Sequence, residues 1–412
     1  MTSSGRWWSL YRQVWSVPGA AAFSSVGALA RLPQAMAGLG AIVLITGLGG
    51  SYAVAGAVAG AISLSQGLLA PQFSRLADRY GQARVLAPQT VANVAALCTL
   101  VAAAQLRAGA VVLIALGVLV GVSLPQIGAF ARARWTALLR GDPRLDTALA
   151  VESLIEEAVF VIGPVLVAAA ATAVAPAAGL LTAAALVALG CTLFLVQRAT
   201  EPVPGSARRS GRRSRATAHA GLWVLIAVFL GIGALFGLIK VGVVALTREM
   251  GRPGVSGIVL ALWAGGSLVS GVFYGSRTRR SAPARRFLLG AAAMAAGTVV
   301  VAVCSGSLVA LTIALVVAGA ANAPTLITGN ALVTAVVPAH VVTEAYTWLG
   351  VTVFAGIAIG APSGGALVDR FGAAGAFWAA TGAGVVALLA AVLGGRLLRT
   401  TAPSPGDLPP AP

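Results

Sequence analysis

The chain has 412 residues, of which 58% are apolar and only 9% are charged, and its mean hydropathy is +0.92. Ordinary soluble domains carry about 25% charged residues, so this composition excludes an ordinary soluble protein. The formal net charge of +17 suggests nucleic-acid binding, but the arginines form short clusters between long apolar runs and no continuous basic stripe. Nucleic acid is therefore excluded as a partner, and a lipid bilayer is expected instead.

The apolar runs, taken in chain order, predict about twelve transmembrane helices. They are expected at 18–47, 52–75, 84–105, 109–131, 146–172, 176–197, 220–246, 254–275, 286–304, 307–332, 341–365 and 374–397. The arginines gather at the N-terminus, after every second span and in the tail, while the other connections hold few. By the positive-inside rule, both termini are cytoplasmic in a multi-pass protein of the cell inner (plasma) membrane.

The chain is predicted to be an all-α membrane protein with two pseudo-symmetric six-helix bundles around a central cavity. Gly163-Pro164 in the fifth span matches Ala361-Pro362 in the eleventh, and such repeats build many transporters. Between the halves lies a stretch rich in Arg, Ser and Pro without helical periodicity, and the tail is Pro-rich and expected to be disordered. The predicted parts are a cytoplasmic N-terminus at 1–17, a first bundle at 18–197, a cytoplasmic linker at 198–219, a second bundle at 220–397 and a tail at 398–412.

The connection after the second span, residues 74–84, carries Leu76, Ala77, Asp78, Arg79 and Gly81 in order. Here the chain resembles the major facilitator superfamily, and within it bacterial drug and metabolite efflux permeases. The family's first glycine and one of its basic residues are missing, although Arg84 supplies a charge nearby. The resemblance implies that this loop latches the two halves together on the cytoplasmic side. In physical terms, Asp78 can cap a helix start and Gly81 permits a tight turn. The alternative interpretation is a solvated turn.

A second copy of the pattern, Gly365 to Gly372, follows the eleventh span, on the outer side in the predicted topology. We interpret it as a capped turn.

Small residues and prolines inside the spans are candidates for close helix packing or hinges. Besides Pro33 in the first span, they are Gly163, Pro164, Gly360 and Pro362, together with the pairs Gly56-x3-Gly60 and Gly271-x3-Gly275. The resemblance implies that span 2 faces span 11 and span 5 faces span 8, so the glycines would line the sliding surfaces. Ordinary helix packing is the alternative.

Charges within the apolar runs are the sharpest functional signal, because they are costly in the bilayer. Arg31, beside Pro33 and Gln34, lies roughly 20 Å along the first span, and Glu156 lies roughly 15 Å along the fifth. We predict that Arg31 pairs with Glu156 or with Glu157, as a structural pair or as a proton or substrate switch. Glu152, one turn before Glu156, is predicted to be a wet helix start.

Other polar side chains could face a substrate, bond between helices or lie at the membrane interface, and the sequence leaves these alternatives open. They are Gln126, Lys240, Asn322, Asn330, Glu344 and Trp348.

These features predict a monomeric secondary transporter that exports a small, partly apolar molecule in exchange for protons by alternating access. Proton-coupled uptake is the alternative, and a receptor or scaffold without transport is a remote one. The sequence holds no HExxH, G-x-S-x-G or P-loop motif, so we expect neither an enzyme nor an ATP-driven pump. No cofactor and no metal is expected, since none of the three cysteines has a CxxC spacing.

Overall fold

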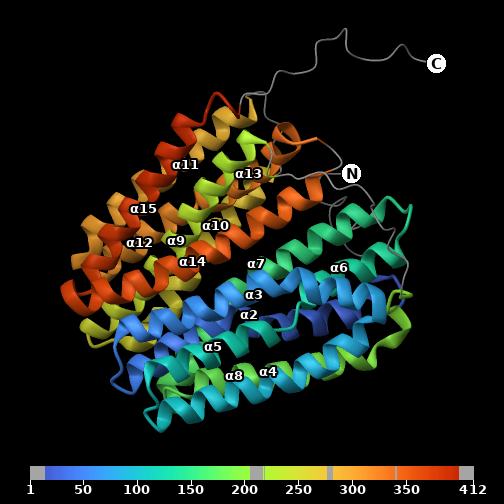
Figure 1. The fold of residues 1–412 in the computed structure, drawn as a ribbon, viewed down its shortest axis with the longest axis horizontal. Helices are drawn as coiled ribbons and strands as arrows, with labels where there is room; N and C mark the ends of the chain where they lie inside the picture. Colours follow the sequence, from blue (N-terminus) through green and yellow to red (C-terminus); the bar gives the residue numbers. More distant parts are fainter. Residues whose placement is uncertain (1–13, 205–216, 218, 276–281, 339–340, 399–412) are drawn as a thin grey trace, which may run out of the picture.

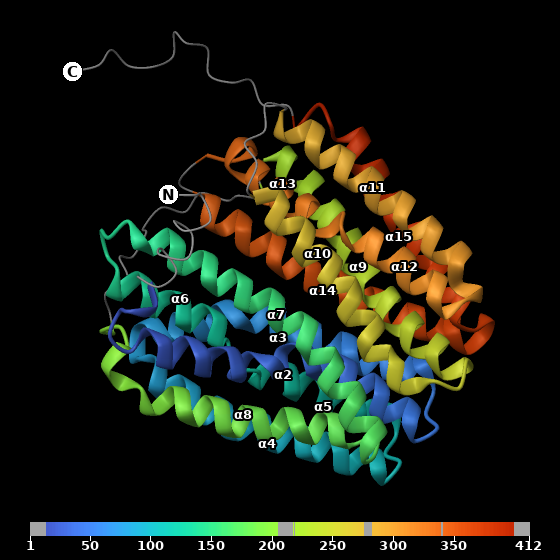
Figure 2. The ribbon, with the colours of Figure 1, turned by 180° about the vertical axis from the view of Figure 1, so that it is seen from behind.

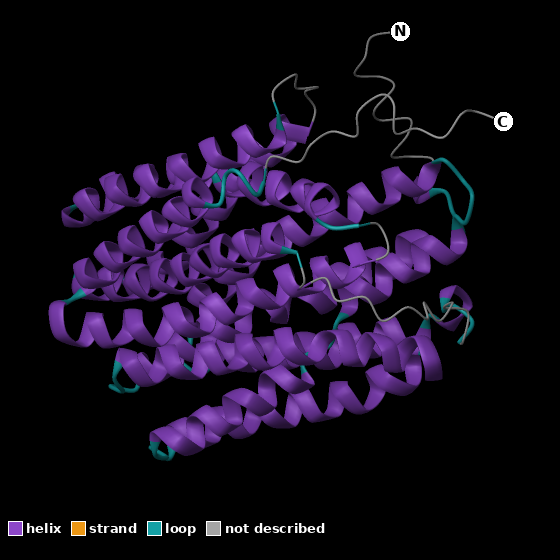
Figure 3. Cartoon of the chain, turned by 45° about the horizontal axis from the view of Figure 1, so that its top comes forward, coloured by secondary structure: helices purple, strands orange, loops and turns teal. Residues whose placement is uncertain are grey.

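The computed structural model describes residues 14–204, 217, 219–275, 282–338 and 341–398. Most of the predicted N-terminal segment, part of the predicted linker and nearly all of the predicted tail lie outside these residues. Throughout the described ranges every regular element is helical (Figure 3), and 12 segments are long and apolar enough to cross a membrane. The prediction of an all-α chain with about twelve membrane spans is confirmed.

Six of the spans form the amino-terminal half (Figure 1). Its helices are α2 (Ala20–Gly47), α3 (Tyr52–Tyr80), α4 (Gln82–Gln105), α5 (Ala110–Ser123), α6 (Ile127–Leu138), α7 (Arg144–Ala173) and α8 (Ala178–Val196). The short 3-10 helix η1 (Arg198–Thr200) follows.

The other six spans form the carboxy-terminal half. Its helices are α9 (Ala220–Glu249), α10 (Ser256–Gly275), α11 (Pro283–Val303), α12 (Leu308–Gly319), α13 (Asn322–Val336), α14 (Val342–Phe371) and α15 (Ala373–Leu393), with the 3-10 helices η3 (Pro253–Val255) and η4 (Cys304–Gly306).

Spans 4 and 10 are each divided into two helices at corresponding places. In span 4 the backbone leaves the helix at Leu124, where Pro125 follows, and α6 begins at Ile127. In span 10, α12 ends at Gly319 and α13 begins at Asn322, just before Pro324. A proline cannot donate the helical hydrogen bond, so these breaks lie where the sequence repeats a glycine followed by a proline.

The two halves meet mainly along two helix pairs, α3 with α14 and α7 with α10, as the resemblance implied. A β-carbon on Gly56 of α3 would collide with the carbonyl of Ala361 in α14, and one on Gly257 of α10 with the carbonyl of Pro164 in α7. Such close backbone approach requires glycine. For Gly163, Gly271 and Gly360 the expectation was wrong, because they face Ala35 of α2, Ala323 of α13 and Ala234 of α9, each within its own half.

The halves are closed at one end of the molecule and diverge at the other. We call the end where α2 begins and α15 ends the terminal end, and the end where α2 ends and α3 begins the far end. The contacts of Gly257 and Gly254, with α7 residues Pro164 and Thr172, lie in the part of α7 that approaches the far end. Figures 1 and 2 agree that the ribbons of the two halves splay apart toward the terminal end.

Candidate substrate and coupling site

Arg31 of α2 and Glu152 of α7 form an ion pair inside the amino-terminal half, where both side chains are almost fully buried. The Glu152 carboxylate also accepts hydrogen bonds from Ser24 Oγ at 2.7 Å and from Trp135 Nε1 at 2.8 Å. Three donors on two helices, α2 and α6, therefore hold this carboxylate of α7, which offsets the cost of burying its charge.

The predicted partner of Arg31 was wrong. Glu152, expected to be a wet helix start, is fully buried, and neither Glu156 nor Glu157 pairs with Arg31. Glu152 lies about two turns into α7, which begins at Arg144, and at this depth it is already inside the bundle. Trp135, which the sequence analysis did not consider, donates to this carboxylate, and its ring makes an edge contact with Phe23.

Glu156 lies one turn further along α7 and is held more loosely. Its carboxylate accepts from Gln34 Nε2 and from Arg132 Nη2, both at 3.4 Å, and its side chain is 25% exposed. These bonds are long, so they contribute less than those around Glu152. Gln34, predicted as a site residue, therefore does join the site, and Arg132 is a member that the sequence analysis missed.

Glu156 and the Arg31 guanidinium approach each other at the backbone of Gly128 in α6. A β-carbon at Gly128 would lie 3.0 Å from Glu156 Oε2 and 3.6 Å from Arg31 Nε. Arg31 Nε and Nη1 are buried without a hydrogen-bond partner among the described residues. An arginine with unused donors thus lies near a second, weakly bound carboxylate, and this arrangement can exchange partners.

A second buried arginine, Arg134, stabilises the terminal end of the same half. It donates to Gln82 Oε1, the Gln197 carbonyl and Thr200 Oγ1, each at 2.9 Å. Its guanidinium carbon lies 3.8 Å from the ring centroid of Phe194. These contacts attach the start of the predicted linker to α6. Nothing in the sequence indicates this role, because Arg134 follows the predicted end of the fourth span at 131, among the arginines that gather after every second span.

Two of the predicted polar residues lie at the helix breaks, and Asn330 lies about two turns into α13. Gln126 precedes α6 and donates to the Leu124 carbonyl at 3.1 Å, while Asn322 is the buried first residue of α13. Asn330 donates to the Leu326 carbonyl of its own helix at 2.9 Å.

The other predicted side chains do not join the Arg31 cluster. Lys240 and Glu157 are half-buried and have no hydrogen bond or ion pair with any described residue. Glu344 lies in the first turn of α14, and Trp348 is 42% exposed one turn later. No group of three or more His, Cys, Asp or Glu residues within the described ranges could hold a metal ion.

The motif after the second span is mostly helix and not a loop. Asp78 and Arg79 belong to the last turn of α3, and the turn is Gly81 alone, with a φ of 99°. Asp78 does not cap the next helix as predicted, because Glu201 does so by accepting from Ala83 N at 2.9 Å. Arg84 lines a cavity of about 520 Å³ beside Glu201 on the terminal end.

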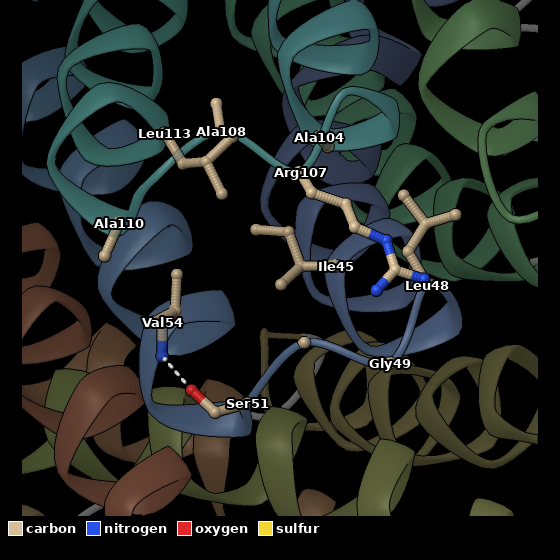
Figure 4. Close-up of a pocket in the computed structure, with 11 residues that line it drawn as sticks. Ile45, Leu48, Gly49, Ser51, Val54, Ala104, Arg107, Ala108, Ala110 and Leu113 are labelled. Atoms are coloured by element: carbon tan, nitrogen blue, oxygen red, sulfur yellow. Dashed lines mark hydrogen bonds between the residues drawn. The ribbon is translucent and has the colours of Figure 1, made fainter.

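Two cavities lie at the far end, apart from the Arg31 cluster. The first, about 230 Å³, lies within the amino-terminal half near Arg107 and Ser51 (Figure 4). The second, about 350 Å³, lies between the halves and is lined by residues that include Thr46, Thr172 and Arg248.

Comparison with known proteins supports the architecture. Residues 226–412 match the family model described as Major Facilitator Superfamily. No curated protein sequence matches the chain. Among solved structures, a variant of the nucleoside transporter NupG is similar with a TM-score of 0.75 at 13% identity, covering 91% of this chain and 99% of that one.

Two further solved structures have the same fold. A POT family peptide transporter described as auto-inhibited gives a TM-score of 0.70 at 15% identity and covers 95% of this chain and 99% of that one. A bacterial homologue of the iron transporter ferroportin, in an inward-facing state, gives 0.66 at 16% identity, covering 91% and 97%. The three named cargoes differ, so at these identities the likeness shows the fold alone.

Proposed function

We propose that the chain is a membrane transporter of the major facilitator superfamily, which the family match over residues 226–412 and the shared fold support, and that it exports a small, partly apolar molecule in exchange for protons. It works as a monomer in the cell inner membrane by alternating access. The observation that carries the proposal is the pair of glutamates on α7, of which one is locked and the other is loosely held.

Glu152 is suited to a structural role and Glu156 to a proton-carrying one. Glu152 is fully buried with three donors, so protonating it would leave Arg31 as an unpaired buried charge. Glu156 is partly exposed and its hydrogen bonds are long, so its protonation disturbs less. In the proposed cycle, proton binding to Glu156 releases Gln34 and Arg132, and these donors then become free to bind substrate.

We assign the terminal end to the cytoplasm, because the arginine-rich connections join the helices there. On this assignment, the described conformation is closed to the outside and its halves diverge toward the cytoplasm. A substrate would enter from the cytoplasm between the halves.

Substrate contacts are proposed at the breaks of spans 4 and 10. Interrupted membrane helices in corresponding positions of two repeats commonly bind the substrate, because their ends offer free backbone groups. Gln126 and Asn322 are the polar side chains there, within apolar surroundings.

The test uses proteoliposomes with an imposed pH gradient and a panel of cationic, neutral and anionic fluorescent dyes. Antiport moves a dye toward the acidic compartment when that compartment faces the far end, whereas symport moves it away. We expect movement toward the acid, and we expect Glu156→Gln to abolish the dependence on the gradient while dye binding persists.

Gln72, an exposed residue of α3 outside the site, supplies the control through Gln72→Glu, which changes charge but should keep the coupling. If Glu156→Gln responded to the pH gradient like the unmodified protein, Glu156 would not be the coupling residue. Dye movement away from the acid would replace export with uptake.

A further inference from the structure

The two copies of the Leu-x-Asp-Arg-aromatic-Gly pattern have the same local structure at opposite ends of the molecule. In α3 the helix ends at Tyr80, Gly81 has a φ of 99°, and α4 begins at the next residue. In α14 the helix ends at Phe371, Gly372 has a φ of 69°, and α15 begins at the next residue. Left-handed backbone favours glycine at both turns.

The helices that follow the two turns are also capped alike. Glu201 Oε1 accepts from Ala83 N at 2.9 Å at the start of α4, and Glu249 Oε1 accepts from Ala373 N at 2.7 Å at the start of α15. Each motif is therefore one repeated unit: a helix end, a glycine turn and a carboxylate-capped helix start. The two units differ in the environment of their aspartates.

Asp369 bridges the two halves at the far end. Its two carboxylate oxygens accept from the backbone amides of Tyr52 at 2.9 Å and Ala53 at 2.8 Å, the first two residues of α3. Ser51 Oγ accepts from the third amide, that of Val54, at 3.2 Å. A carboxylate from one half thus satisfies the free amides, and the positive dipole end, of a helix in the other half.

Asp78 has no such partner in this conformation. It is exposed and makes no hydrogen bond or ion pair with any described residue. The helices α3 and α14 run antiparallel, with Gly56 against Ala361 and Gly67 against Phe354. Moving the same number of residues from Gly67 toward the end of α3 and from Phe354 toward the start of α14 reaches Asp78 and position 343. Asp78 is therefore level with the second residue of α14. The ribbons have diverged there (Figure 1).

We infer that Asp369 is a positioning residue of the transport cycle, a latch that holds the far end closed by capping α3 and is released when the terminal end closes. The antiparallel register allows the aspartate of either motif to cap the first turn of the opposing helix. In the structure only one end of the α3–α14 contact is held by such a cap, the one from Asp369, so in the inferred cycle the two caps alternate. This inference rests on alternating access but on neither the proposed substrate nor the proton.

The test measures opening of the far end directly. In a chain with Cys98, Cys191 and Cys304 replaced by alanine, Thr46→Cys gives a single reporter that is 3% exposed and lines the cavity between the halves. Its rate of labelling by a membrane-impermeant maleimide, added from the far-end side of proteoliposomes, reports opening. Asparagine keeps one acceptor oxygen, but it turns an NH₂ group toward the second amide and removes the charge at the start of α3. These losses together amount to about a tenfold equilibrium factor, so Asp369→Asn should raise the rate about tenfold.

A matched control is Glu249→Gln, which removes a helix-capping carboxylate within one half and should leave the rate unchanged. A second variant, Gly365→Ala, weakens the contact between α3 and α14 by a different means, because its β-carbon would collide with the Tyr52 carbonyl. Its control is the neighbouring Gly364→Ala, whose β-carbon would face Leu238 of its own half at 3.1 Å. We expect faster labelling from the first and no change from the second. Asp78→Asn should slow labelling, and the double variant should return toward the unmodified rate.

Unchanged labelling in both Asp369→Asn and Gly365→Ala, or an equal increase in Glu249→Gln, would overturn the latch. If Asp369→Asn did not give a monodisperse size-exclusion peak, Asp369→Glu would be tested instead. This variant keeps the charge, but its longer side chain must form the hydrogen bonds with the Tyr52 and Ala53 amides in a new geometry. Labelling needs no substrate and no pH gradient. A failure of proton-coupled export would therefore leave this result standing, and the reverse also holds.

Discussion

Replacing Glu152 with glutamine should be among the most destabilising single changes in the amino-terminal half. Glutamine can still accept from Ser24 and Trp135, so the packing survives, but the Arg31 charge loses its only described counter-ion. Removing one partner of a buried ion pair costs about 3–5 kcal/mol. We expect Glu152→Gln to lower the free energy of unfolding by about this amount, measured by denaturant titration in detergent micelles with tryptophan fluorescence.

The double variant Arg31→Met with Glu152→Gln separates the charge from the packing. Because replacing a whole buried pair by apolar groups is often neutral, most of the lost stability should return when both charges are removed. Asp142→Asn breaks the exposed Asp142–Arg144 pair and should change stability little. If the double variant were less stable than Glu152→Gln alone, the reasoning that an orphaned Arg31 charge causes the loss would be refuted.

Three further changes test other contacts. Gly81→Ala should lower the free energy of unfolding by about 1–3 kcal/mol, because Gly81 has a φ of 99°. In the same denaturant titration Gly109→Ala should leave the stability unchanged, because no atom lies near its β-carbon. Arg134→Lys should speed proteolysis of the segment after η1, because lysine cannot bridge Gln82, Gln197 and Thr200 at once. Gly257→Val should reduce dye transport in proteoliposomes at least tenfold, since its side chain would displace the Pro164 carbonyl of α7.

The number and order of the spans followed from the sequence because a bilayer imposes one strong constraint. Each crossing needs a long apolar run, and the arginines between the runs mark alternate ends. The predicted edges differ from the helices chiefly where a span continues past its apolar part, as α3 does through Asp78 to Tyr80. There the helix continues beyond the apolar stretch, and the polar residues form its last turns.

The partner of Arg31 could not be read from the sequence, because Glu152, Glu156 and Glu157 lie within two turns of one helix. Distance along α2 and α7 allowed any of them. The choice depends on which carboxylate Ser24 and Trp135 also reach, and Trp135 comes from α6, whose position depends on the break after Ser123. Contacts that join three helices depend on how the helices pack, and the spacing of residues along one helix does not predict that packing.

The second motif shows what a pattern match leaves out even where the predicted capped turn is present. The sequence located the repeated aspartate at the end of a helix, and the helix does end there. What it could not give is the position of Tyr52 and Ala53 beside Asp369, more than three hundred residues away in the chain. Because α3 and α14 are antiparallel, the aspartate end of each helix is level with the start of the other, and in this structure Asp369 caps the start of α3. In the proposed latch, a rigid-body movement that joins one end of this helix pair parts the other, so the alternation would need no additional moving element.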